Sequence, residues 1–134
     1  MKVAVNRCYG GFGLSNEAVE LIAKKKGMNI TKVPTAYKFD RVWCLGDLSS
    51  FLKLEKTFHT SSEDRKKYLS RKISPYTFYK DRTDKDLLEV IQELGSTVND
   101  RTSNLEIVEI PDDIEWEISE YDGMESIEEK HRRW

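Results

Sequence analysis

The chain has 134 residues, of which 38% are hydrophobic and 34% are charged, and its formal net charge is -2. This length suits one compact domain with a sizeable core, and no apolar run approaches the roughly 18 residues of a membrane-spanning helix. The start of the chain turns polar after five residues, which is not typical of a secretory signal. Two cysteines, Cys8 and Cys44, make no disulfide scaffold, so we expect reduced, buried thiols in a cytosolic protein.

The charges are unevenly distributed along the chain. Residues 1–67 hold 13 Lys and Arg against 7 Asp and Glu, residues 68–134 hold 9 against 17, and residues 105–129 hold 11 acids and no Lys or Arg. A uniformly basic nucleic-acid binder is therefore not expected. The simpler interpretation is two solvated faces of opposite charge. The other is that the charges serve binding, either by joining copies head to tail or by attracting an anionic ligand to a basic site. We expect a homo-oligomer.

The first third of the chain predicts a strand, a turn and a helix. Alternation of Val3 and Val5 with polar neighbours predicts a strand over Met1–Cys8. A glycine-rich break follows, and Ser15 is a good N-cap for a helix that Gly27 closes.

The middle of the chain is less regular. Short strands are expected over Asn29–Val33 and Lys38–Leu45. The basic segment 49–72 is predicted to be an insertion or a mobile flap, with a short helix over Ser62–Leu69. After Pro75, a run rich in aromatic residues predicts a strand over Tyr76–Lys80.

The last third predicts two helices around two strands. Thr83 with Asp86 forms a capping box for a helix that Gly95 ends. Strands are expected over Leu105–Ile110 and 114–118. A second capping box, Asp122 with Glu125, predicts a terminal helix whose inner face is Met124, Ile127, His131 and Trp134. The whole, residues 1–134, is predicted to be a single α+β domain with a mixed or antiparallel sheet and about three helices.

The strand–glycine–helix order near the N-terminus is a candidate anion site. Helix-start N–H groups attract anions, and glycines let a phosphate approach the backbone. Arg7 adds a charged fork, and two aromatic side chains are available to stack on a base. The predicted ligand-binding residues are Arg7, Tyr9, Gly10, Gly11, Phe12, Gly13, Ser15 and Asn16. The spacing matches no known phosphate-binding motif, so a tight turn that needs glycine conformations is the competing interpretation.

Three other groups have both a chemical and a structural interpretation. Glu128 and His131, with Asp122 and Glu125, could bind a metal or move protons, but we expect His131 to pack in the core. Cys8 precedes the glycine loop and is more typical of a structural thiol than of a nucleophile. The ending Arg132-Arg133-Trp134 would suit either an interface or a helix end. No metal or cofactor is expected.

Two segments resemble a group of short proteins encoded by tailed phages and prophages of low-GC Gram-positive bacteria. The first is N-R-C-Y-G-G-F-G-L-S at residues 6–15, with Glu17-Ala18. The second runs from I-V-E-I-P-D-D-I-E-W-E-I at residues 107–118 through E-Y-D-G at 120–123 to Glu129, His131, Arg132 and Trp134. Together they cover roughly half of the chain, and residues 29–79 share no such likeness. The resemblance implies a phage origin and, by itself, no activity.

The function expected on these grounds is that of a phage accessory, anti-defence protein in the host cytoplasm. It would sequester a small anionic, nucleotide-like ligand such as an immune signal, with the glycine loop, Arg7 and basic or aromatic residues from Lys53–Arg82. One alternative is a protein-binding inhibitor of a host defence complex that uses the acidic run, in the manner of a DNA mimic or an anti-CRISPR protein. Another is a phosphodiesterase-like or glycosidase-like enzyme that uses Glu128, His131 and Asp122.

Overall fold

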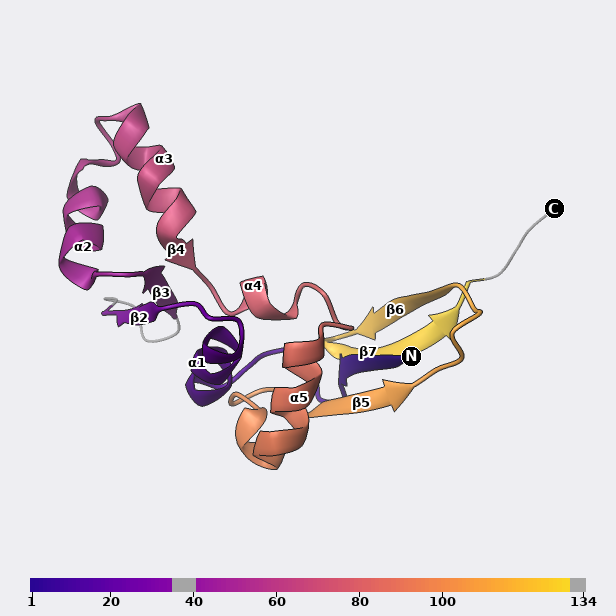
Figure 1. Ribbon diagram of the computed structural model, residues 1–134. Coiled ribbons are helices and arrows are strands. Elements are labelled where there is room, and N and C mark those ends of the chain that lie inside the picture. Colours follow the sequence, from indigo (N-terminus) through magenta and orange to yellow (C-terminus); the bar gives the residue numbers. More distant parts are fainter. Residues whose placement is uncertain (35–40, 131–134) are drawn as a thin grey trace. The chain divides into compact units, whose positions relative to one another are not determined.

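A computed structural model describes residues 1–34 and 41–130 (Figure 1). The chain divides into two compact units: unit 1 comprises Met1–Ile22 with Phe78–Trp134, and unit 2 comprises Ala23–Thr77. Unit 2 is therefore inserted in sequence between the two segments of unit 1. The fold is α+β as predicted, and its described strands pair antiparallel in three small sheets. Among the described residues, no helix is long and apolar enough to cross a bilayer.

Unit 1 is built on four neighbouring strands. Strand β1 (Lys2–Asn6) pairs with β5 (Leu105–Glu109), and β6 (Trp116–Tyr121) forms a hairpin with β7 (Met124–Glu129). β7 lies beside β1, and helix α5 (Lys85–Leu94) packs against β1 and β5 (Figure 1). The one-turn 3₁₀ helix η1 (Gly95–Val98) follows α5.

The core of unit 1 surrounds β1. Val3, Ala4 and Val5 are all fully buried, so β1 is covered on both faces rather than on the one face that its alternation predicted. Strands β5 and β7 and helix α5 all contact β1. Helix α5 contributes Leu87, Val90 and Ile91 to the buried set.

The predicted helix signals near the N-terminus are confirmed. Helix α1 (Asn16–Lys25) begins after Ser15, whose hydroxyl accepts a hydrogen bond from the Ala18 N–H at 3.2 Å. Gly27, with φ +71°, follows its end. The predicted cap of α5 was wrong by one residue. Asp84 accepts from the Leu87 N–H at 3.0 Å, while the Thr83 hydroxyl donates to Asp81.

Unit 2 combines a three-stranded sheet with a pair of helices. Strands β2 (Ile30–Val33), β3 (Val42–Leu45) and β4 (Lys72–Ile73) are antiparallel neighbours. This confirms both predicted strands within the described residues; the expected start of the second, 38–40, lies outside them.

The basic segment 49–72 is helical for most of its length. Helix α3 (Ser62–Arg71) confirms and extends the predicted short helix, whereas α2 (Leu48–Thr57) was not predicted. A small core of Val33, Cys44 and Phe51 lies against this helix pair.

The aromatic segment after Pro75 is a helix, so the predicted strand over Tyr76–Lys80 was wrong. It forms the one-turn helix α4 (Tyr76–Tyr79), with Phe78 buried. Proline before a helix start has the backbone angle that a helix needs. Strand propensity of aromatic residues is a matter of neighbours, and this segment pairs with no other described strand.

The predicted terminal helix was also wrong, because the described part of that segment is strand β7. Asp122 and Gly123 have φ values of +53° and +92°, as a two-residue hairpin turn requires, and Asp-Gly is a strong signal for that turn. In the hairpin Ile118 lies directly opposite Ile127, a cross-strand pair that a helix over this segment could not form. His131 and Trp134, the rest of the predicted helix face, lie outside the described residues.

Candidate functional site

The glycine loop of residues 9–13 meets the β6–β7 turn within unit 1. The Gly10 N–H donates to the Asp122 carbonyl at 3.1 Å. A Cβ at Gly123 would overlap the backbone nitrogen of Gly11, so no larger residue fits at this contact. Gly10 and Gly11 have φ values of +117° and +101°, which side chains disfavour. The tight-turn interpretation therefore accounts for these glycines.

Asn6, at the end of β1, fastens the loop and the turn together. Its side-chain amide donates to the carbonyls of Gly123 at 2.8 Å and Cys8 at 2.7 Å. Its side-chain oxygen accepts from the Asn104 N–H at 2.8 Å. Asn6 is fully buried, and this set of bonds satisfies a polar group that would otherwise be costly to bury.

An ion pair between Arg82 and Glu125 lies under the loop. The guanidinium donates to both carboxylate oxygens, at 2.6 and 2.9 Å, and the two side chains are only 16% and 6% exposed. The Glu125 carboxylate also accepts from the Asn6 N–H at 2.9 Å. The Arg82 guanidinium lies 3.9 Å from the centre of the Phe12 ring. The pair thus joins β1, the loop, the segment before α5 and β7.

Several of the predicted ligand-binding residues already contact other residues of unit 1. The Arg7 guanidinium donates to Glu106 at 3.3 Å and to the Glu125 carbonyl at 2.9 Å. A Cβ at Gly13 would overlap the Asp100 carboxylate. The Ser15 hydroxyl donates to the Thr97 carbonyl at 2.7 Å, and Asn16 begins α1. The loop's cation is therefore paired with an acid, and another carboxylate lies against the loop.

Two tyrosine side chains flank this contact. Tyr9, just before Gly10, is 58% exposed, and Tyr121, just before Asp122, is 78% exposed. Asp122, next to Tyr121 in sequence, is also exposed, whereas Glu120 precedes Tyr121 in β6 and so points to the opposite face of the hairpin. We call Tyr9, Tyr121 and Asp122 the tyrosine face. Sequence reasoning named Tyr9 but not Tyr121, which it took for part of a turn before a helix.

The hairpin behind the tyrosine face carries like charges opposite each other. Glu117 is the cross-strand partner of Glu128, and both are exposed. Like charges in directly opposite positions destabilise a strand pair. A cationic partner bound to this surface would relieve that repulsion.

The geometry expected for metal or acid–base chemistry does not form in the described residues. Glu128 is in a strand rather than a helix, so the helical spacing that related it to His131 is lost, and His131 lies outside the described part. Among the described residues, no three His, Cys, Asp or Glu side chains are placed to hold a metal ion. Cys8 is half-buried, and burial raises the pKa of the Cys44 thiol, which keeps that thiol protonated.

The charge imbalance of the sequence follows the two units. Unit 1 has 9 Lys and Arg against 19 Asp and Glu, a net charge of -10. Unit 2 has 13 against 5, a net charge of +8. The near-neutral total therefore describes neither unit.

Fold and site together define a two-unit α+β protein of antiparallel sheets, with an acidic unit 1 and a basic unit 2. Neither a family model, nor a curated protein, nor a solved structure matches this chain. Its function must therefore be inferred from its own residues.

Proposed function

We propose that this chain is a binding protein that holds a basic protein partner on the tyrosine face of unit 1. The observation that carries the proposal is that Tyr9 and Tyr121 are both exposed and directly precede Gly10 and Asp122, whose backbones are joined by a hydrogen bond. Tyrosine is enriched among the residues that dominate interface energies. A rigid support lowers the entropy lost when such side chains are ordered by a partner.

The charge of the surroundings supports a basic partner. The tyrosine face includes the exposed Asp122 carboxylate, and unit 1 as a whole has a net charge of -10. Complementary charge steers the encounter of two proteins and selects among partners, while the apolar anchors supply most of the affinity. The repulsion between Glu117 and Glu128 would fall when a cationic surface approaches.

The resemblance to phage and prophage proteins supports a biological role for that binding. The two resembling segments, residues 6–15 and 107–134, are the ones that meet at the tyrosine face through Gly10 and Asp122. We propose that the protein acts in the cytoplasm of the host cell, as an inhibitor of a host defence complex.

Sequestration of a small nucleotide-like anion at the glycine loop is the competing proposal. Arg7 would have to leave Glu106, and the ligand would lie near the Asp100 carboxylate. Both features oppose anion binding, so the protein partner is the better supported of the two.

Affinity capture tests the protein partner. Immobilised wild-type chain, a Tyr9→Ser/Tyr121→Ser variant and a Tyr76→Ser control would be incubated with lysate of a low-GC Gram-positive host. Tyr76 is 59% exposed and lies in unit 2, so it matches Tyr9 in exposure. We expect one basic protein to bind the wild type and the control stoichiometrically, and to bind the double variant at least about tenfold more weakly.

Two outcomes of the capture experiment would count against the proposal. Equal capture by all three chains would place the partner elsewhere on the molecule. No stoichiometric protein, together with a thermal shift by a nucleotide, would favour the small ligand. Far-UV circular dichroism should be the same for all three chains, because each substituted side chain is exposed.

We propose in addition that copies of the chain self-associate, because units of net charge -10 and +8 attract each other between molecules. Sedimentation velocity at low salt and tens of micromolar protein should show a dimer or larger species. High salt should weaken it, since the screening length falls from about 10 Å at 0.1 M to about 3 Å at 1 M. A monomer at low salt would contradict this prediction.

A further inference from the structure

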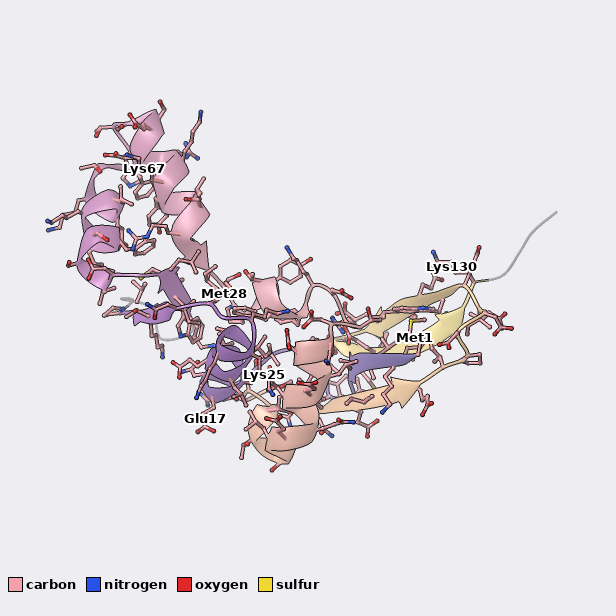
Figure 2. The ribbon with its side chains drawn as sticks, viewed as in Figure 1. Met1, Glu17, Lys25, Met28, Lys67 and Lys130 are labelled. Atoms are coloured by element: carbon pink, nitrogen blue, oxygen red, sulfur yellow. The ribbon has the colours of Figure 1, made fainter. Side chains whose placement is uncertain are left out.

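The outer surface of the α2–α3 pair is strongly basic. Helix α3 has no buried residue, and its side chains, Lys67 among them, are drawn in Figure 2. Six exposed cations lie on or next to the two helices, and we call them together the basic helical face: Lys53, Lys56, Arg65, Lys66, Lys67 and Lys72. Arg65, Lys66 and Lys67 are successive residues of α3 and so spread around that helix. Within the described part of the chain, Lys53, Lys56, Arg65 and Lys66 form no salt bridge.

Two of the nearby carboxylates are used inside the helix pair. Asp47 caps α2 by accepting from the Ser50 N–H at 2.9 Å and the Ser49 hydroxyl at 2.8 Å. The Asp64 carboxylate accepts from the Thr57 hydroxyl at 2.6 Å. Neither carboxylate forms a salt bridge with a cation of the basic helical face within the described residues, although each keeps its negative charge. The exposed Glu55 and Glu63 also lie on these helices, and Lys67 pairs with Glu63 at 3.4 Å.

The helix pair is a firm support for these cations. The Tyr68 ring stacks on Phe51 and Phe58, with ring centres 4.9 and 4.7 Å away. Arg71 ties the end of α3 to the start of α2 and to β3, by donating to the carbonyls of Leu45 and Asp47 at 2.9 and 2.7 Å. The cations are thus attached to helices whose relative position within unit 2 is fixed by ring stacking and by the hydrogen bonds of Arg71.

We propose that the basic helical face binds the phosphate backbone of a nucleic acid, without reading its sequence. A helix of ten residues spans about 15 Å, the length over which one strand of B-DNA places about four phosphates. The expectation against a uniformly basic nucleic-acid binder came from the acidic residues of the second half of the chain, whereas unit 2 alone has a net charge of +8. This site lies in unit 2 and does not depend on the function proposed for unit 1.

The acidic unit 1 of a second copy is the competing occupant. Each exposed ion pair between protein surfaces contributes little free energy, so the self-association proposed above would hold this face only weakly. A phosphate backbone instead releases its condensed counterions when cations replace them, which makes binding of about 10⁻⁴–10⁻⁶ M usual even without sequence recognition. The nucleic acid is therefore the better match to a face made almost entirely of charge.

Fluorescence anisotropy with a labelled 20-base-pair DNA duplex tests the proposal on the full chain. The variant is Arg65→Gln/Lys66→Gln, and the control is Lys2→Gln/Lys85→Gln, which removes the same net charge from exposed positions of unit 1. With four to six phosphates neutralised, affinity should fall on the order of 10²–10³-fold between 50 and 200 mM salt. The variant should bind more weakly and lower the log–log salt slope by about 2, while the control keeps the wild-type slope.

Three results would overturn the proposal. These are no binding of the duplex at 50 mM salt, a variant with the wild-type slope, or an equal loss in the control. If the variant also abolishes self-association but binds the duplex as tightly as wild type, the face belongs to a second copy. Variant and control should melt like the wild type, because none of the four side chains is buried.

Discussion

Arg82→Met should strongly destabilise unit 1. The substitution leaves the Glu125 carboxylate buried opposite an apolar side chain. The carboxylate loses both hydrogen bonds from Arg82 and keeps the one from the Asn6 N–H. Removing one partner of a buried ion pair costs about 3–5 kcal/mol, a large share of the stability of a small domain. Hydrogen exchange of the β1 and β7 amides is the suitable measurement, because the two units need not unfold together.

Two further variants separate loss of the pair from loss of charge. Arg82→Met/Glu125→Met should be more stable than Arg82→Met alone, since no unpaired charge remains buried. Lys85→Met, at an exposed position in the same unit, should change stability by less than about 0.5 kcal/mol. An Arg82→Met chain with wild-type protection in β1 and β7 would mean that the ion pair does not support unit 1.

Gly123→Ala should open the contact between the glycine loop and the hairpin turn. The new Cβ would overlap the Gly11 nitrogen, and the backbone there has φ +92°. Gly11→Ala is the matched control, because its φ is +101° but its Cβ would meet no atom within 4 Å. The control should lose about 1–2 kcal/mol for the left-handed backbone, and Gly123→Ala should lose a further 1–3 kcal/mol, roughly, for overpacking.

The Gly123→Ala and Gly11→Ala variants would be compared in two measurements, the free energy of unfolding and the capture of the partner. Gly123→Ala should also weaken capture of the partner, because it displaces the support of the tyrosine face. Equal stability losses for the two variants would show that backbone conformation alone requires glycine there. The close approach of loop and turn would then have no energetic role.

Local signals predicted much of the secondary structure. The Ser15 cap, Gly27 after α1, Gly95 after α5 and the strand over residues 105–109 act over a few residues, and each is present. The errors arose where two local signals competed. Asp122 suits both a capping box and a hairpin turn. The residues after it pair with β6 as strand β7, and this pairing selected the turn.

The site was predicted only in part, because its ties are long-range. The sequence indicated the glycine loop, but the residues that hold it come from distant positions. Arg82 and Glu125 are 43 residues apart, and Asn6 and Glu125 are 119 apart. No periodicity or spacing in one sequence relates such positions. Tyr121 likewise became part of the site only through the turn that brings its neighbour Asp122 to Gly10.

Native mass spectrometry of the full chain, purified from host cells without denaturation, tests the proposed function most directly. The binding of a basic protein on the tyrosine face predicts a complex whose mass is that of the chain, or a small multiple of it, plus one further protein. The Tyr9→Ser/Tyr121→Ser variant prepared in the same way should lack the added protein. A wild-type chain that retains an anion of nucleotide size and no protein would contradict the account and assign the loop to a small ligand.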